Sequence, residues 1–164
     1  MTIRRRIGGL LAATLLSALF VGITHEAPAS AAPAAPSCTS EGCNYQDPHQ
    51  TGCDRDGRAL ESFWRDNTFI SLKYSPSCNA AWAYGYTLKS TYAPCNSWND
   101  HDLLWIEGSS GGRIVAYTMN CLSSAPGNVV YTNMVSFNYW TRACLVKGRA
   151  ADWSLTYNGC TSWR

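Results

Sequence analysis

Three features of the sequence predict an all-β domain, a small disulfide-stabilised sandwich or barrel-like fold with a cysteine-rich N-terminal loop. Short segments rich in β-branched and aromatic residues recur through the second half of the chain, divided by Gly, Pro, Asn and Asp. No stretch after the leader shows the 3.6-residue period of a long helix. Eight cysteines lie between residues 38 and 160, which fits a small secreted domain held together by disulfides.

The N-terminal stretch has the features of a secretory signal peptide. Arg4, Arg5 and Arg6 precede an apolar run from residue 7 to residue 23, and Ala29-Ser30-Ala31 offers the small residues that a signal peptidase reads. A membrane anchor is the alternative, but the run only reaches the lower limit of about 17 residues for a spanning helix. We therefore expect a signal peptide over residues 1–31, a flexible lead-in over 32–37 and a single domain over 38–164, secreted without stable membrane insertion.

Charge gives little support for a nucleic-acid partner. The whole chain of 164 residues has 13 Lys and Arg against 11 Asp and Glu. Three arginines and Glu26 leave with the leader, so the secreted form keeps 10 residues of each sign and is formally neutral. Phosphate binding needs a basic patch, and the remaining basic residues are scattered. We expect a monomer that binds an extracellular ligand and no nucleic acid.

All the cysteines follow the leader, and their even number in an exported chain predicts disulfides. Their pairing cannot be read from the sequence, although Cys78 is the expected anchor for one cysteine of the N-terminal loop. A cysteine-bound zinc site is the competing interpretation, but no C-x-x-C occurs and the histidines lack ligand spacing. We therefore expect no metal and no cofactor. The cysteines are Cys38, Cys43, Cys53, Cys78, Cys95, Cys121, Cys144 and Cys160.

The first half of the domain is expected to hold a loop and then three strands. Residues 43–53 have turn chemistry and almost no apolar side chain, so disulfides and side-chain hydrogen bonds must shape this loop. Residues 59–64 begin a strand, Asp66-Asn67 reverses the chain, and residues 68–74 form a clear strand with partial period-two alternation. After a turn at 75–78, residues 79–88 fit either a helical turn or a strand, and we favour the strand.

The second half is expected to continue as hairpins. Residues 103–107 form a strand, 108–112 a loop tip and 113–119 the returning strand. A turn at 124–128 precedes a strand over 129–135, and two further strands follow at 138–146 and 153–157. No internal repeat supports a trefoil, so a sandwich or small barrel remains the prediction.

A family resemblance rests on a few segments of this chain. Asp47-Pro48, Thr51-Gly52-Cys53, Asp56 and the block from Leu72 to Ala83, with Ser75-Pro76-Ser77-Cys78-Asn79-Ala80-Ala81-Trp82 at its centre, carry it. Here the chain resembles the secreted YjfA-like bacterial proteins classed as domain of unknown function 2690. The resemblance covers most of residues 38–164 and implies an exported, disulfide-stabilised domain without implying an activity. Gly57 stands where the family usually has Ala, and Lys73 replaces the common Arg.

Asp54, Asp56 and Glu61 form part of a calcium-loop pattern. The full EF-hand pattern needs a third acidic or amide ligand before the glycine, and calcium takes six to eight oxygens. The alternative is that these aspartates cap turns. The loop by itself is incomplete as a calcium site.

His49, His101 and Asp102 are the candidate catalytic residues, because the histidines lie close in sequence to carboxylates. No G-x-S-x-G elbow and no activated-cysteine motif accompany them, so polar loop residues are the alternative interpretation. We therefore favour a binding role over an extracellular hydrolase, and we do not expect an enzyme.

Trp98, Trp105, Trp140 and Trp153 are the candidate ligand-binding residues. Flat aromatic rings can stack on sugar rings or peptides, and neighbouring polar side chains can bond hydroxyl groups. Ordinary core packing is the alternative, and spacing does not distinguish the two. We expect a secreted binding or interaction module for cell wall, carbohydrate or protein, with a hydrolase, an inhibitor or an antibacterial factor as alternatives.

Overall fold

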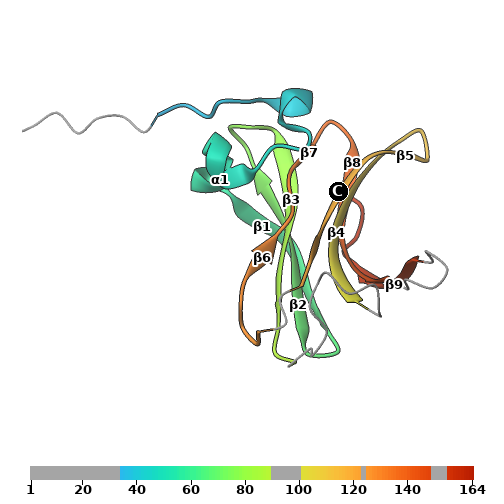
Figure 1. Cartoon of the computed structure of the whole chain (residues 1–164). Coiled ribbons are helices and arrows are strands. Elements are labelled where there is room, and N and C mark those ends of the chain that lie inside the picture. The colour runs from blue at the N-terminus through green and yellow to red at the C-terminus, as the bar shows by residue number, and fades with distance from the viewer. Residues whose placement is uncertain (1–33, 90–100, 123–124, 149–154) are drawn as a thin grey trace, which may run out of the picture. The chain divides into compact units, whose positions relative to one another are not determined.

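The structure is a computed structural model that describes residues 34–89, 101–122, 125–148 and 155–164. The described residues belong to one compact unit and form two antiparallel sheets, one of five strands and one of four. The sheets pack face to face, as Figure 1 shows, so the predicted all-β sandwich is confirmed. Within the described part of the chain, no helix is long and apolar enough to cross a membrane.

The five-stranded sheet is a meander with two short strands added at its edge. Strands β1 (Arg58–Arg65), β2 (Thr68–Ser75) and β3 (Ala80–Thr87) pair in sequence order. Asp66 and Asn67 join β1 to β2 with φ values of 48° and 63°, as a two-residue hairpin turn requires. The expected strands and reversal of this half are confirmed, including a strand after Asn79. Both β6 (Val130–Tyr131) and β7 (Val135–Ser136) pair with β3.

The four-stranded sheet has the order β5-β4-β8-β9. Its strands are β4 (His101–Ser110), β5 (Arg113–Cys121), β8 (Trp140–Gly148) and β9 (Leu155–Cys160). The loop tip expected at 108–112 is wrong, because β4 continues through Ser110. A bulge after Gly108 keeps the pairing with β5, and Gly111 and Gly112 alone make the turn, at φ values of 58° and 77°.

The continuous strand expected over 129–135 is also wrong. Thr132 interrupts the ladder: its backbone N–H donates to the Ala83 carbonyl, and its hydroxyl accepts from the Ala83 N–H at 3.0 Å. Met134 then pairs with the N-terminal loop, exchanging backbone hydrogen bonds with Tyr45 and Gln46. The segment is therefore divided because it connects the sheet to that loop.

The N-terminal segment is more ordered than the expected loop. It contains η1 (Ser40–Cys43), α1 (Pro48–Thr51) and η2 (Cys53–Asp56). The Asp47 carboxylate caps α1 by accepting from the backbone N–H of His49 at 2.7 Å and of Gln50 at 3.1 Å. Gly52, at φ 76°, ends the helix in the left-handed conformation. Local capping hydrogen bonds thus stabilise a segment that has few apolar side chains to bury.

Two packed regions hold the fold together. Ile70, Leu72, Leu104, Ile106 and Leu145 fill the space between the sheets. A second, sulfur-rich region lies under the N-terminal segment, where cysteine sulfurs pack with Ala80, Trp82 and Met134. The described disulfides are Cys38–Cys43, Cys53–Cys78 and Cys144–Cys160; Cys121 is also disulfide-bonded, and Cys95 lies outside the described residues.

The expected anchoring of a loop cysteine by Cys78 is confirmed, since Cys78 pairs with Cys53. Both cysteines are fully buried. Their disulfide therefore connects the N-terminal segment to the turn that leads into β3.

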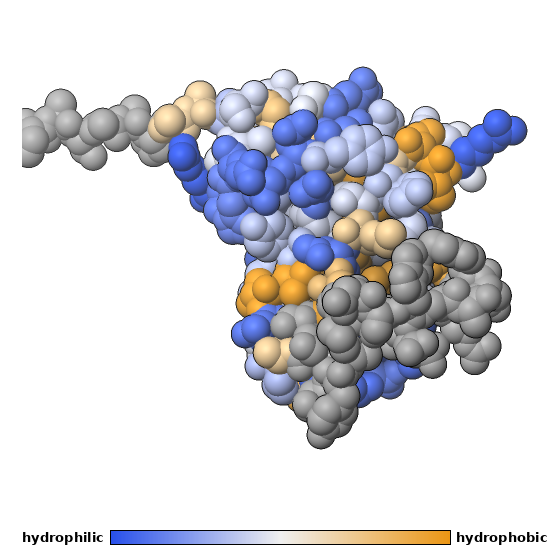
Figure 2. Space-filling view, in the orientation of Figure 1, coloured by the Kyte–Doolittle hydropathy of each residue, from blue (hydrophilic) through white to orange (hydrophobic). Residues whose placement is uncertain are grey.

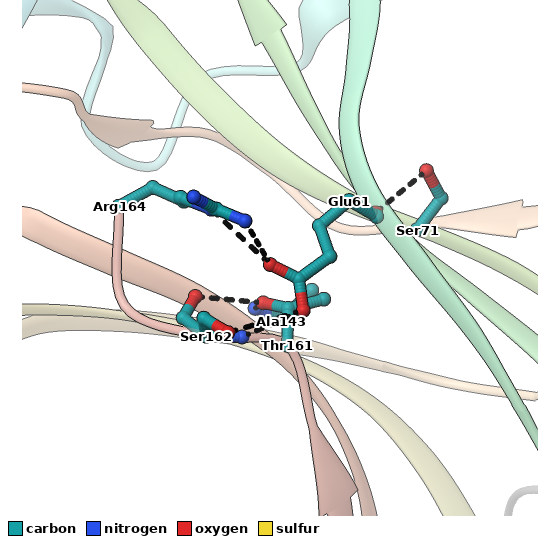
Figure 3. A network of polar contacts seen from close by, with 6 residues as sticks. All are labelled: Glu61, Ser71, Ala143, Thr161, Ser162 and Arg164. Atoms are coloured by element: carbon teal, nitrogen blue, oxygen red, sulfur yellow. Dashed lines mark hydrogen bonds and ion pairs between the residues drawn. The ribbon is translucent and has the colours of Figure 1, made fainter.

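A polar network ties the edge strand β1 to the C-terminal tail (Figure 3). The Glu61 carboxylate accepts from the Ser162 backbone N–H at 3.0 Å and from the Arg164 guanidinium at 2.7 Å. The Ser162 N–H is the main cause that lowers the pKa of Glu61, and Arg164 lowers it further. The ionised carboxylate therefore stabilises the contact between the two sheets.

Replacing Glu61 with Gln is expected to remove about 1 kcal/mol of stability at neutral pH. Since the folded-state pKa of Glu61 lies below the usual pKa of a glutamate, this contribution is fully present above that usual pKa and is lost as the pH falls through the folded pKa. Urea unfolding of both proteins across an acid titration measures the difference. A difference that stays constant into strong acid would show that the charge of Glu61 is irrelevant.

Candidate functional site

The register of the four-stranded sheet separates a buried face from an outer face. Leu104, Ile106, Ala143 and Leu145 belong to the core between the sheets. The intervening residues of the same strands point the other way, because side chains alternate along a strand. We call this outer surface the aromatic face and define it by Trp105, Glu107, Tyr117, Trp140, Arg142, Tyr157 and Trp163.

Glu107 lies at the centre of the aromatic face and is fully buried. Its Oε2 accepts from the Trp105 indole N–H at 3.0 Å and from the Tyr157 hydroxyl at 2.8 Å. Its Oε1 accepts from Arg142 Nε at 2.5 Å. A buried carboxylate is costly unless it is paired and hydrogen-bonded, and these partners meet that need. Glu107 therefore fixes the positions of two rings and one guanidinium group.

Four rings of the aromatic face, those of Trp105, Tyr117, Tyr157 and Trp163, lie in two stacks. Trp105 and Tyr117 are parallel, with an interplanar angle of 4° and centroids 4.8 Å apart. The Arg142 guanidinium carbon lies 4.3 Å from the Trp163 ring centroid and 5.3 Å from that of Tyr157. Cation–π contacts of this kind are stabilising where the cation is partly desolvated. The stacks hold the aromatic side chains in fixed orientations.

Several of these rings remain open to solvent. Trp105 is only 6% exposed, but its stacking partner Tyr117 is 51% exposed, and Tyr157 and Trp140 are 46% and 65% exposed. Figure 2 shows an apolar patch near the start of β5, where Ile114 and Val115 are also about half exposed. Exposed aromatic area held on a rigid sheet is typical of a binding surface.

Tyr157 is a fixed hydrogen-bond donor in this network. Burial raises the pKa of its hydroxyl, and the hydrogen bond to Glu107 raises the pKa further. The phenol is therefore protonated at neutral pH and keeps donating to the carboxylate.

The residues that carry the family resemblance lie elsewhere and build the scaffold. The Asp56 carboxylate accepts from the Ser75 hydroxyl and from the Ser77 backbone N–H at 2.8 Å, which holds the turn before β3. Burial alone would raise the pKa of Asp56, but these hydrogen bonds offset it and leave the pKa lowered. A Cβ at Gly57 would lie 2.6 Å from the Trp82 ring, so here the glycine leaves room for that ring.

A family model described as "Protein of unknown function (DUF2690)" matches residues 41–144. The chain belongs to this family. Comparisons with curated proteins and with solved structures give no match. In this DUF2690 domain the matched range contains the Asp47 and Asp56 caps and most of the aromatic face. Tyr157 and Trp163, which flank Arg142, lie beyond it.

Two of the four predicted tryptophans lie on the aromatic face of this DUF2690 domain, and their predicted role in ligand binding stays a prediction. Trp105 and Trp140 both lie on the aromatic face, whereas Trp98 and Trp153 lie outside the described residues. Trp105 serves mainly as the base on which Tyr117 stacks. Sequence reasoning missed Glu107, Tyr117, Arg142 and Tyr157. For Glu107 on β4 and Arg142 on β8, alternation with the core residues was the available signal, but it needed the strand register.

His49 lies on α1, and its Nδ1 is 2.6 Å from the Asp54 carboxylate. Its ring also contacts Tyr131 edge-on, with centroids 4.5 Å apart. The His49 side chain is 52% exposed. The pair stabilises the N-terminal segment by linking α1 to η2 and to β6.

The second predicted histidine, His101, lies far from His49 along the sandwich. His101 begins β4, opposite Gly148, and Asp102 follows it. Further along β4, Leu104 lies against Gly85 of β3, whereas Gly108 lies against Val135, close to the N-terminal segment. The strand therefore begins at the far end of the sandwich from α1. His49 and His101 do not form one site.

The carboxylates of the calcium hypothesis also have separate partners. Asp54 pairs with His49, Asp56 holds the turn before β3, and Glu61 binds the C-terminal tail. A calcium site needs several oxygens that converge on one point. Asp56 has the turn-capping role that was the alternative, whereas the Asp54 and Glu61 carboxylates form pairs with His49 and Arg164.

Proposed function

We propose that this chain is an exported binding module that holds an uncharged polysaccharide against the aromatic face. The leader and the disulfides support export. The stacked, half-exposed rings support recognition of pyranose rings, whose flat faces pack on aromatic side chains. The observation that carries the proposal is the parallel Trp105–Tyr117 stack beside the Arg142 stack, fixed from below by Glu107.

The ring geometry favours this face over the other outer surface. On the five-stranded sheet, Trp64 meets Tyr86 edge-on at 88° and Phe69 at a tilt of 58°, and Phe69 and Tyr86 are tilted by 30° to each other. Rings that pack edge-on fill one another's faces and present an uneven surface. In the parallel stack of the aromatic face, Tyr117 is 51% exposed, which supports stacking of a ligand ring on it.

The charged residues of the aromatic face support an uncharged ligand. Among the described residues that the strand register places on this face, Glu107 and Arg142 carry charge, and they pair with each other. The Arg142 side chain is 26% exposed, so part of its donor capacity can reach a ligand hydroxyl. An acidic polymer would find no net positive charge in these residues.

The state of Glu107 supports binding rather than hydrolysis. Glycoside hydrolysis commonly uses two carboxylates, one of which must reach the glycosidic oxygen. Glu107 is fully buried and its oxygens accept three hydrogen bonds, so it is committed to positioning.

Retention on insoluble matrices tests the proposal. The secreted form is mixed with cell-wall material and with neutral and acidic polysaccharides, and a general hydrolase screen is run in parallel. We expect retention on a neutral polysaccharide without turnover. Retention on none of the matrices, or turnover that is lost when His101 is replaced, would overturn the proposal.

Tyr117→Ala is expected to weaken retention about tenfold or more, because truncating a central aromatic contact commonly removes more than 1 kcal/mol of binding energy. Trp64→Ala is the matched control, since Trp64 is 53% exposed and Tyr117 is 51% exposed on opposite sheets. Binding isotherms on the retained matrix measure both variants. Equal losses in the two variants would mean that the aromatic face is not the binding surface.

A further inference from the structure

The two disulfides of the N-terminal segment form a single cluster of sulfur atoms. The Sγ atoms of Cys38, Cys43, Cys53 and Cys78 all lie within 4.8 Å of one another. Cys38 Sγ and Cys53 Sγ, which belong to different disulfides, are 3.7 Å apart. Three of the four cysteines are fully buried. The scaffold therefore brings four soft ligand atoms from three separate segments to one point.

Within each disulfide the two sulfurs are bonded, so the four sulfurs reach the dimensions of a tetrathiolate metal site only once both bonds are reduced. Zinc binds cysteine sulfur at about 2.3 Å in a tetrahedron, which places neighbouring sulfurs about 3.8 Å apart. The Cys38–Cys53 sulfur distance of 3.7 Å already matches that edge. The spacing from Cys38 to Cys43 also falls within the range seen between paired zinc ligands.

Groups around the cluster suit thiolates. The Thr51 hydroxyl donates to Cys53 Sγ at 3.1 Å, and the Ser77 hydroxyl lies 3.9 Å from Cys78 Sγ. Hydrogen bonds to metal-bound thiolates orient and stabilise them. Buried Trp82 and Met134 pack against the cluster and shield it from water.

We propose that the reduced chain holds one zinc ion at these four cysteines, so that the same scaffold is closed by two disulfides or by one metal. Each disulfide takes two electrons and two protons from a dithiol reductant, which becomes a disulfide itself. Zinc then binds the four thiols and displaces their four protons. The site is independent of the aromatic face and of its ligand.

Cobalt substitution tests the coordination. The full secreted form is reduced without oxygen, the reductant is removed, and Co²⁺ is added. We expect one Co²⁺ per chain, with the visible absorption bands of tetrahedral thiolate coordination, displaced by Zn²⁺. The Cys53→Ser/Cys78→Ser variant should lose these bands, and the matched control Cys144→Ser/Cys160→Ser should keep them. Bands that are absent from the wild type, or that survive in the first variant, overturn the proposal.

Alkylation gives a second measurement on the unmutated chain, which does not depend on whether a variant folds. Reduced protein is treated with an alkylating reagent with and without Zn²⁺, and modified peptides are quantified by mass spectrometry. We expect zinc to slow alkylation of the four cluster cysteines at least about tenfold, given the strength of structural zinc sites. Cys144 and Cys160 provide the internal control and should be unaffected. Equal protection of all six cysteines, or of none, contradicts the assignment.

Discussion

Replacing Glu107 with alanine is expected to lower the free energy of unfolding by about 3 kcal/mol. The change leaves the Trp105 indole N–H and the Tyr157 hydroxyl without their acceptor and leaves Arg142 without its counter-ion. Unsatisfied buried donors and an unpaired cation are each destabilising. Because the Arg142 side chain is 26% exposed, water can partly solvate the unpaired guanidinium group. The loss in free energy of unfolding is therefore at the low end of the range for broken buried ion pairs.

Denaturant unfolding followed by tryptophan fluorescence measures this effect, since Trp105 lies in the network. Glu107→Gln is the matched control: it keeps the volume and one acceptor oxygen but removes the charge, so its loss should be about half as large. Glu107→Ala should also disorder the ring stacks and weaken ligand retention. A variant within about 0.5 kcal/mol of the wild type would contradict the positioning role of Glu107.

Removing the Cys53–Cys78 disulfide with a double alanine substitution is expected to lower stability by about 3.5 kcal/mol. The sequence separation of 25 is the largest among the three described disulfides, and both cysteines are fully buried. In the chain-entropy account, the longer loop gives the unfolded chain more freedom when the bridge is lost. The N-terminal segment should loosen first, because it has few apolar residues of its own.

Hydrogen exchange measures where the chain loosens when the Cys53–Cys78 disulfide is removed. The Cys38–Cys43 double alanine variant is the control. That bridge closes a loop with a separation of only 5, for which the same account gives about 2 kcal/mol. Backbone amides of α1 and η2 should exchange at least about tenfold faster in the Cys53–Cys78 variant, while β4 and β8 keep their protection. A uniform acceleration through both sheets would show that the N-terminal segment and the sandwich unfold as one unit.

Much of the fold was predictable because the local signals agree with it. Asp66-Asn67 and the partial alternation from Thr68 to Tyr74 predict a hairpin and a strand without reference to the rest of the chain. The prediction of a continuous strand around Thr132 failed because the backbone of this segment pairs with Ala83 and with the N-terminal loop. Those partners are remote in sequence, so no local pattern could indicate the interruption.

The candidate site was less accessible to sequence reasoning. Trp105 and Trp140 stood out as tryptophans, but their shared face depends on the pairing of β4 with β8. Glu107 gave no motif signal, since its role comes from groups on β8 and β9 that lie 35 and 50 residues away. The carboxylates near Asp54 looked alike in sequence and turned out to serve different partners.

The affinity of residues 32–164 for a neutral polysaccharide shows whether the aromatic face or the other outer surface binds the ligand. Soluble fragments of that polysaccharide are titrated calorimetrically into the wild type, Tyr117→Ala and Trp64→Ala. The account predicts at least about tenfold weaker binding for Tyr117→Ala and unchanged binding for Trp64→Ala. Unchanged binding for Tyr117→Ala together with a loss for Trp64→Ala would contradict it and move the binding surface to the five-stranded sheet.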